Sequence, residues 1–284
     1  MWRWMFEGRS LPAVGRVVAL GRPRVDFRRP ETVRDALKEV RPAIVWNAVA
    51  DTAVDEIEMR ESEARQVNAE APGVLAAEVR RLGAMLVHFS TDYVFDGRKE
   101  GAYVETDAPN PLNAYGRTKL AGEIAVRQAG GSHRILRTSR VYGPRGHNFL
   151  RRMLELGHAK KKIRVVNDQI SVPTWSRTLA EASTVIATRL LDPRDSWADW
   201  TGTYHLAARG ATSWYGFARA IRDSVVRCGG TWQPAIVPIS TRDYPTLARR
   251  PAKLCARQHA SRAQLWAEPA PVGYGRHPGR QGDP

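Results

Sequence analysis

Short apolar runs alternate with amphipathic segments along the first half of this chain. The apolar and β-branched runs have the length of buried strands, and they predict strands at residues 17–20, 43–50, 84–90 and 134–139. Between them, apolar positions recur at helical spacing and predict helices at residues 30–39, 61–82 and 113–128. Because strands that alternate with helices pair in parallel, the pattern predicts an α/β fold with a doubly wound parallel sheet.

The pattern changes after residue 143. The following segments predict helices at residues 149–157, 176–191 and 213–227, with short strands at residues 163–166 and 204–208. We therefore expect a sheet domain at residues 1–143, a smaller lobe at residues 144–252 and a tail at residues 253–284. The tail is rich in Arg, Pro and Gly without a helical or strand period, so it is expected to be disordered.

The composition is that of a globular protein, with 43% hydrophobic and 26% charged residues among 284. No apolar run approaches the ~20 residues of a membrane-spanning helix, and the first residues lack the apolar stretch of a secretory signal. We therefore expect a cytoplasmic protein without a membrane partner. Cys228 and Cys255 stand far apart without metal-ligand spacing, so they predict buried thiols and no metal site.

The net charge of +15, from 44 Lys and Arg against 29 Asp and Glu, raises the question of a polyanionic partner. The basic residues are scattered along the whole chain, and they form no stripe together with aromatic residues. This distribution is that of an Arg-rich chain with a basic tail. It argues against a nucleic-acid partner.

Polar segments follow three of the predicted strands. In open parallel sheets, ligands bind beyond the carboxyl ends of the strands, so these segments are the first place to look for a site. They are residues 47–55, 90–97 and 137–143, with the sequences NAVADTAVD, STDYVFDG and RTSRVYG.

Tyr115 and Lys119 are the first candidates for chemistry. Their spacing of four places both side chains on one face of the predicted helix. A tyrosine titrates at a pH of about 10, and a cation such as Lys119 favours its phenolate and lowers its pKa. This spacing also arises by chance in surface pairs, but here it follows a strand that ends in Ser90 and Thr91, whose hydroxyls could hold a substrate carbonyl. Thr91 could equally bond its own backbone at the strand end.

Several motifs in consistent order, from Val17 to Pro251, resemble those of one enzyme family. They are FSTDYVFDG, ETDAPNPLNAYGRTKLAGE, ILRTSRVYG, VVNDQISVPTW and YHLAARGATSWYGFA. Together they resemble the extended short-chain dehydrogenase/reductases of the NAD-dependent epimerase/dehydratase superfamily and, within them, the dTDP-4-dehydrorhamnose reductase family. The resemblance implies a Rossmann-like dinucleotide-binding domain at residues 1–143, a substrate-binding lobe at residues 144–252, a dTDP-sugar substrate and NADPH or NADH. It also allows a homodimer and a supporting Mg²⁺ ion, although no metal-ligand spacing demands the ion.

The family's chemistry implies a role for each matching residue. Hydride from the nicotinamide would reach the 4-keto carbon of dTDP-4-dehydro-L-rhamnose, while Tyr115 protonates the oxygen to give dTDP-L-rhamnose. Lys119 would lower the pKa of Tyr115 and bind the nicotinamide ribose, and Thr91 would hydrogen-bond the oxygen. By the same matching, the cofactor would contact Asp26, Phe27, Ala50, Asp51, Thr52, Tyr115 and Lys119, and the substrate would contact Val54, Thr91, Asp92, Tyr93 and Arg140.

The region expected to bind the cofactor departs from the family in one respect. The family has a glycine-rich turn whose amides receive the pyrophosphate, whereas this sequence contains no GxGxxG or GxxGxxG. Residues 1–20 resemble a start within or just after the helix that follows that turn, so we expect weakened cofactor binding. Arg22 and Arg24 suit a 2′-phosphate, and Asp26 suits a free hydroxyl or is a carboxylate that precedes a helix, so the choice between NADPH and NADH stays open.

Two further departures concern the substrate and the tail. Arg140 stands where the family usually has tryptophan, which leaves open a related nucleotide-sugar reductase, epimerase or dehydratase. Permitted codons from residue 254 onward, read one base earlier, can encode a segment like the family's usual ending, so we hypothesise a one-base insertion near Lys253, in the gene or in its sequencing. A non-catalytic homologue that acts as a binding or regulatory subunit is the alternative function.

Overall fold

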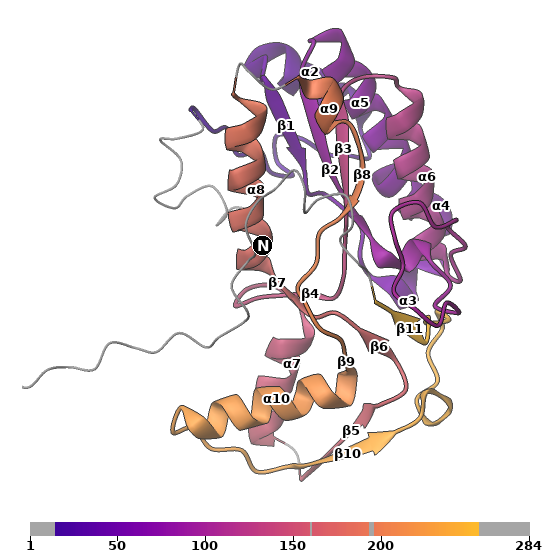
Figure 1. Ribbon diagram of the computed structural model, residues 1–284, viewed down its shortest axis with the longest axis vertical. Coiled ribbons are helices and arrows are strands. Elements are labelled where there is room, and N and C mark those ends of the chain that lie inside the picture. Colours follow the sequence, from indigo (N-terminus) through magenta and orange to yellow (C-terminus); the bar gives the residue numbers. More distant parts are fainter. Residues whose placement is uncertain (1–14, 160, 193–195, 256–284) are drawn as a thin grey trace, which may run out of the picture.

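A four-stranded parallel sheet forms the centre of the larger domain (Figure 1). The computed structural model describes residues 15–255, except residues 160 and 193–195. The strands are β1 (Ile44–Asn47), β2 (Met85–Thr91), β3 (His133–Thr138) and β8 (Gly202–His205). They lie in the order β1-β2-β3-β8, and each neighbouring pair is parallel. The predicted α/β fold with a parallel sheet is confirmed.

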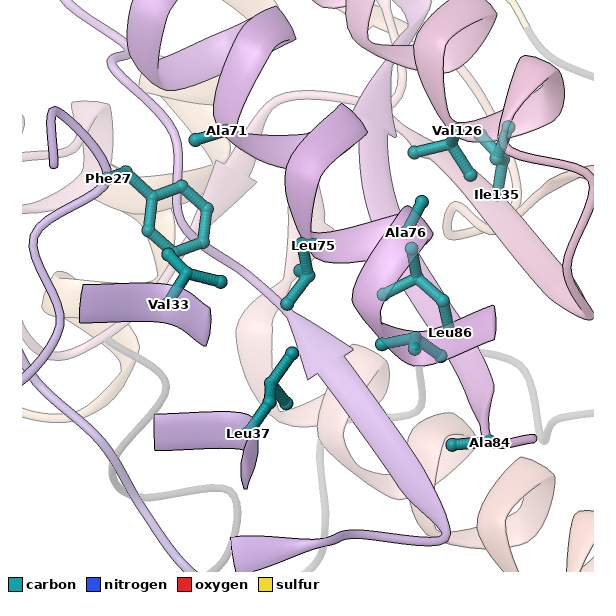
Figure 2. Packing of buried hydrophobic residues seen from close by; sticks show 11 residues of the cluster. Phe27, Val33, Leu37, Ala71, Leu75, Ala76, Ala84, Leu86, Val126 and Ile135 are labelled. Carbon is teal, nitrogen blue, oxygen red and sulfur yellow. The ribbon is translucent and has the colours of Figure 1, made fainter. Parts of the chain in front are cut away.

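Helices cover both faces of this sheet, as in a doubly wound fold. One face packs against α2 (Pro30–Val40), α5 (Ala71–Arg81) and α6 (Ala114–Gln128), and the other packs against α8 (Ser176–Leu190). Figure 2 shows the first of these two cores, where side chains of α2, α5 and α6 meet those of β2 and β3. Alternate residues of β2 serve the two cores, since Leu86 belongs to the first and Val87 to the second.

The helix predicted at residues 61–82 changes its winding in the middle. It consists of α4 (Glu61–Arg65), the π-helical segment η2 (Gln66–Glu70) and α5. Single π-helical turns are rare and often occur at functional sites. Here η2 carries Asn68, a fully buried side chain that reaches the candidate site described below.

The smaller lobe lies at the carboxyl edge of the sheet (Figure 1). Its core joins α7 (Phe149–Ala159) and α10 (Trp214–Arg227) to the parallel pair β5 (Lys162–Val166) and β10 (Ala235–Ile239). Short strand pairs connect it to the larger domain, namely β4 (Val141–Tyr142) with β7 (Thr174–Trp175), and β6 (Ile170–Ser171) with both β9 (Thr212–Ser213) and β11 (Lys253–Leu254). The remaining short elements are α3 (Val54–Ile57), η3 (Asp92–Val94), α9 (Trp197–Trp200) and η4 (Thr241–Asp243). Within the described part, no helix has the length and apolar character needed to cross a membrane.

Two local predictions were wrong. Residues 17–20 were predicted as a strand, but they are irregular, with Val17 and Leu20 exposed. β-Branched residues form a strand only where a neighbouring strand accepts their hydrogen bonds, and none of the described strands pairs with this segment. Cys228 was predicted to be buried but is exposed, because it follows the last turn of α10.

The start of the tail also differs from expectation. Lys253 and Leu254 form β11 beside β6, and Leu254 is buried against Phe95 and Tyr103. The order at these two residues comes from strand pairing and from a backbone hydrogen bond of 2.7 Å between Tyr103 N and Cys255 O. Residues 256–284 lie outside the described residues, so the expected disorder and the frameshift hypothesis stay predictions, as do the domain boundaries.

After η4 the chain returns from the smaller lobe to the larger domain, where it forms hydrogen bonds with Asp55. The carboxylate of Asp55 accepts hydrogen bonds from Ala248 N at 3.1 Å and from Arg250 Nη2 at 2.7 Å. We expect Asp55→Ala to lower the free energy of unfolding by about 1 kcal/mol, because two bonds are lost at a partly exposed carboxylate. Urea unfolding checks this, with Glu56→Ala as the control, since Glu56 is more exposed and has only a 3.5 Å contact to Arg60. Equal stability of Asp55→Ala and Glu56→Ala would contradict the expectation.

Candidate active site

Helix α6 brings the predicted catalytic pair to the carboxyl edge of the sheet. Asn113 caps its N-terminus, since the side-chain oxygen accepts a hydrogen bond from Gly116 N at 2.8 Å. The amide of Asn113 also donates to Arg249 O at 2.9 Å, which ties the cap to the returning chain. The cap fixes the first turn of the helix, with Tyr115 in that turn and Lys119 one turn further along.

Two glycines on α6 allow other segments to approach it closely. A Cβ at Gly116 would lie 2.3 Å from Tyr93 O, and a Cβ at Gly122 would lie 2.1 Å from Asn68 O. Both distances are far below van der Waals contact with backbone atoms. The glycines therefore let η3 and η2 pack directly on the helix that carries Tyr115.

Lys119 is a buried ammonium with one hydrogen bond in the described part. Its side chain is 1% exposed, and Nζ donates to Phe89 O of β2 at 2.7 Å. Burial lowers the pKa of Lys119 to about 8, although the nearby carboxylate of Glu123 favours the charged form. At neutral pH Lys119 therefore remains mostly charged, with two N–H donors left for a ligand.

The Tyr115 hydroxyl lies beside Thr91 at the end of β2. The ring of Tyr115 packs edge-on against Tyr93, two residues beyond Thr91, with the ring centroids 5.8 Å apart. The pKa of Tyr115 is raised, first by burial and then by the negative charges of Asp92 and other acids. That Lys119 lowers this pKa in the working enzyme stays a prediction. A phenol with a raised pKa keeps its proton at neutral pH, which is the form that a general acid requires.

Asp92 follows Thr91 and is fully buried. Its Oδ1 receives the Thr91 hydroxyl at 3.3 Å, while Oδ2 has no hydrogen-bond partner among the described residues. Burial raises the pKa of Asp92 to about 6, against the opposing effects of Ser139 and Arg140. This orphaned oxygen is the acceptor that a substrate hydroxyl requires.

We expect Asp92→Asn to stabilise the fold at pH 7.5 by on the order of 1 kcal/mol. The folded state binds the Asp92 proton more tightly than the unfolded chain, so the wild type loses stability as the pH rises from about 4 to above 6. Asparagine carries no charge and avoids this loss. Urea unfolding at pH 4.5 and 7.5 should show a gain that grows with pH, whereas Asp35→Asn, at an exposed position, should show none. A loss of stability at pH 7.5 would rule out this account.

The loop after β1 is held in place by η2. Asn68 accepts a hydrogen bond from Asp51 N at 2.8 Å and donates both to Asp51 O at 3.0 Å and to Thr118 on α6 at 3.1 Å. The Asp51 carboxylate pairs with Arg60. The predicted groove residues Ala50, Asp51 and Thr52 lie on this loop, and Val54 begins α3 directly after it. Their contacts with cofactor or substrate stay a prediction.

Asp26 and Phe27 lie in the segment before α2, next to the core that α2 and α5 form on one face of the sheet. The Phe27 ring is buried among Val33, Ala71 and Leu75 (Figure 2). The Asp26 carboxylate pairs with Arg28, whose hydrogen bond lowers the pKa of Asp26 to about 2. Phe27 therefore helps to form this core, and the contacts of Asp26 and Phe27 with a cofactor stay a prediction.

Arg140 connects the sheet edge to the smaller lobe. Its backbone has a φ of 38°, in the left-handed region that few residues other than glycine adopt. Its guanidinium carbon lies 3.8 Å from the centre of the Trp214 ring, and Nη2 donates to Gln169 O at 3.0 Å. Burial lowers the pKa of Arg140 to about 10, against the opposing effect of the Asp92 charge. That Arg140 contacts the substrate stays a prediction.

Three buried residues that shape the site were missed by the sequence analysis. They are Asn68, Glu123 and Arg137. Glu123 lies four residues beyond Lys119, so extending the same helix spacing by one turn would have found it. Arg137 stands in an otherwise apolar strand, which signals a buried charge that needs a partner. Asn68 gave no such signal, because its role depends on the π-helical turn.

The family model of the RmlD substrate binding domain matches residues 9–270. This chain belongs to that family. A curated relative from Burkholderia thailandensis, a dTDP-4-dehydrorhamnose reductase, is 43% identical over 263 residues, which are 92% of this chain and 88% of the relative. The dTDP-4-dehydrorhamnose reductase of Escherichia coli K12 is 40% identical over 228 residues, 80% of this chain and 75% of the relative. The resemblance deduced from the motifs is thus confirmed.

Solved structures agree with the RmlD assignment. The dTDP-4-dehydrorhamnose reductase of Bacillus anthracis in complex with NADP has a TM-score of 0.80 at 31% identity, with 88% of this chain and 84% of that chain covered. The corresponding protein of Clostridium acetobutylicum has a TM-score of 0.78 at 32% identity, with 89% and 88% covered. The Bordetella bronchiseptica enzyme WbmG in complex with NAD, at 15% identity and a TM-score of 0.67, shows the fold alone, with 85% of this chain and 71% of that chain covered.

Proposed function

We propose that this RmlD-family chain is an oxidoreductase that reduces the 4-keto group of dTDP-4-dehydro-L-rhamnose to give dTDP-L-rhamnose, with NADPH or NADH. One observation carries the proposal: the Tyr115 ring packs edge-on against Tyr93 at the end of β2, next to Thr91 and Asp92 in the chain, with Lys119 buried one helical turn away. Relatives named as dTDP-4-dehydrorhamnose reductases, at 43% and 40% identity, support the choice of substrate.

Each of these site residues has its own role in a carbonyl reduction. NADPH or NADH, when bound, supplies the hydride. Tyr115 holds its proton at neutral pH and gives it to the carbonyl oxygen, and the Thr91 hydroxyl hydrogen-bonds the same oxygen as charge develops on it. Asp92 Oδ2, which lacks a partner in the described part, accepts a sugar hydroxyl. The product therefore gains one hydride at carbon and one proton at oxygen.

The described residues fit the nicotinamide end of a dinucleotide. Lys119 uses one of its three N–H donors on Phe89 O, so two remain for ribose hydroxyls. The Asp51 loop, fixed by Asn68, lies at the carboxyl end of β1, where dinucleotides bind in open α/β sheets. Residues 15–255 show no glycine-rich turn between a strand and a helix, so the binding experiment also tests whether the chain holds the cofactor without one.

Several finer points belong to the proposal. We infer that the protein acts in the cytoplasm as a homodimer, that Val54, Tyr93 and Arg140 contact the sugar, and that Asp26, Ala50 and Thr52 contact the cofactor. A supporting Mg²⁺ ion is a further prediction. In the part of the chain that the structure describes, no group of three or more His, Cys, Asp or Glu side chains is placed to hold a metal. Activity with and without EDTA tests the role of the ion.

Fluorescence titration with NADPH and NADH, followed by product analysis with dTDP-4-dehydro-L-rhamnose, tests the proposed function. We expect dissociation constants near the micromolar range, equivalent to about −8 kcal/mol, and dTDP-L-rhamnose as product. No binding up to millimolar cofactor would contradict the proposal and favour the non-catalytic homologue. Binding with a different sugar product would instead indicate a related nucleotide-sugar reductase, epimerase or dehydratase.

A further inference from the structure

The carboxylate of Glu123 is a buried charge without a part in the proposed reaction. Glu123 lies on α6 one turn beyond Lys119 and two turns beyond Tyr115, on the same helix face. Its side chain is 0% exposed. Ser90 Oγ donates to Oε1 at 2.6 Å, and Arg137 donates from Nε to Oε1 at 2.9 Å and from Nη2 to Oε2 at 2.7 Å.

These contacts hold Glu123 in its charged form. Burial raises the pKa of Glu123, but the hydrogen bonds and charge of Arg137, together with Ser90 and Arg127, outweigh burial and leave this pKa below its usual value. Arg127 contributes less, since it is partly exposed and its Nη1 lies 3.3 Å from Oε2. A buried pair of this kind rarely stabilises a fold more than apolar residues of the same size would. Its retention in the core therefore calls for a reason other than stability.

Lys119 provides that reason, because it is a second buried cation, one helical turn before Glu123 on the same helix. The neighbouring strand β2 contributes His88, which burial and the charge of Lys119 keep neutral by lowering its pKa well below the usual value. Strand β3 contributes the cation Arg137, and α6 contributes the neutral phenol of Tyr115. Glu123 is the carboxylate whose charge acts on Lys119 in favour of the ammonium.

Other elements packed on α6 also carry acidic groups, including the buried Asp92 on η3, but Glu123 is the carboxylate whose charge acts on Lys119. Segment η2 presents the neutral Asn68, which bonds Thr118. Segment α4 presents Glu61, but this carboxylate pairs with Arg117 on the exposed side of the helix.

We propose that Glu123 is a positioning residue, whose carboxylate, fixed by Arg137 and Ser90, keeps the Lys119 ammonium charged and in place beside Tyr115. The effect on catalysis rests on the proposed function, whereas the effect on the charge of Lys119 does not require substrate or cofactor. The two can therefore be tested separately.

The first experiment measures the titration of Lys119 in the whole protein. Biosynthetic incorporation of lysine labelled with ¹³C at Cε allows each lysine to be titrated by NMR, with Lys119→Arg to assign the signal. In Glu123→Gln we expect the pKa of Lys119 to fall by about one unit or more, because an opposite charge at this range shifts a pKa by that amount. In Glu123→Asp and Arg127→Gln it should stay near the wild-type value. An unchanged titration in folded Glu123→Gln would overturn the proposal.

The second experiment compares kcat of Glu123→Gln and the wild type between pH 6 and 8. The loss should be several-fold at pH 7.5 and should narrow toward pH 6, where Lys119 regains its proton. Glu123→Asp should restore most of kcat at pH 7.5. A loss that is equal at every pH would show that Glu123 only supports the fold, and would overturn the proposal.

A further variant guards against failure to fold. Glu123→Gln combined with Arg137→Gln removes the pair as a unit and leaves no buried guanidinium without its partner. Its Lys119 titration should shift in the same direction by a smaller amount, since a positive neighbour is lost as well; an unshifted titration would overturn the proposal. If Lys119 titrates as expected but the wild type does not reduce the sugar, the proposed function fails and the role of Glu123 in holding the charge of Lys119 stands.

Discussion

Replacing Tyr115 with phenylalanine is expected to lower kcat about 10²- to 10⁴-fold, because the substitution removes the proton that the carbonyl oxygen receives. The ring packing against Tyr93 is retained, so the fold and the binding of NADPH should change little. Steady-state rates of NADPH oxidation with the dTDP-sugar, together with the fluorescence titration, measure both quantities.

Tyr93→Phe is the matched control for Tyr115→Phe. Its ring contacts that of Tyr115, but its hydroxyl is assigned to the sugar, so KM should rise while kcat stays within about tenfold of the wild type. Equal losses of kcat in the two variants would contradict the assignment of Tyr115 as the proton donor. Retention of full activity in Tyr115→Phe would exclude Tyr115 as the proton donor.

Replacing Arg137 with methionine is expected to lower the free energy of unfolding by about 3–5 kcal/mol, because it leaves a buried carboxylate without its main partner. Arg137 is 4% exposed and makes two hydrogen bonds to Glu123, which is itself fully buried. Urea unfolding at pH 7.5 measures the loss. Arg127→Met, which removes a longer and partly exposed contact to the same carboxylate, should cost at most about 1 kcal/mol.

The loss in Arg137→Met should depend on pH. In the wild type the pKa of Glu123 lies below its unfolded value, so its contribution is present above about pH 4.5 and is lost as the pH falls through the folded pKa. Without Arg137, burial dominates and raises this pKa above the unfolded value, so protonation at pH 5 should relieve part of the loss. A loss of unfolding free energy that is equal at pH 5 and pH 7.5, or one below about 1 kcal/mol, would show that it does not come from breaking the Arg137–Glu123 pair.

Local pattern was sufficient for most of the secondary structure. The predicted helix at residues 113–128 forms α6, with Asn113 as its cap, and the predicted helix at residues 213–227 forms α10, with Ser213 as its cap. Capping and helical period act over a few residues, so they are encoded locally. The strand prediction at residues 17–20 was wrong because strand formation depends on a partner strand far away in the sequence.

The sequence by itself determined the family and allowed the residues of the site to be predicted. Tyr115 and Lys119 are related by helical spacing and Thr91 stands at the end of an apolar strand, so these three could be named from a local pattern, whereas Asp92 was predicted from the family resemblance alone. The motifs in their order then identified the family, as the match over residues 9–270 confirms.

Only the tertiary structure decided the electrostatic state of these groups. Burial raises the pKa of Tyr115 and of Asp92 and lowers that of Lys119, and burial depends on which helices and segments cover the strand ends. The partners of Glu123 lie on β2 and β3, 33 and 14 residues away in the chain, so no local spacing could reveal them. Desolvation and long-range pairing are properties of the packed fold, and for that physical reason they cannot be read from the sequence pattern.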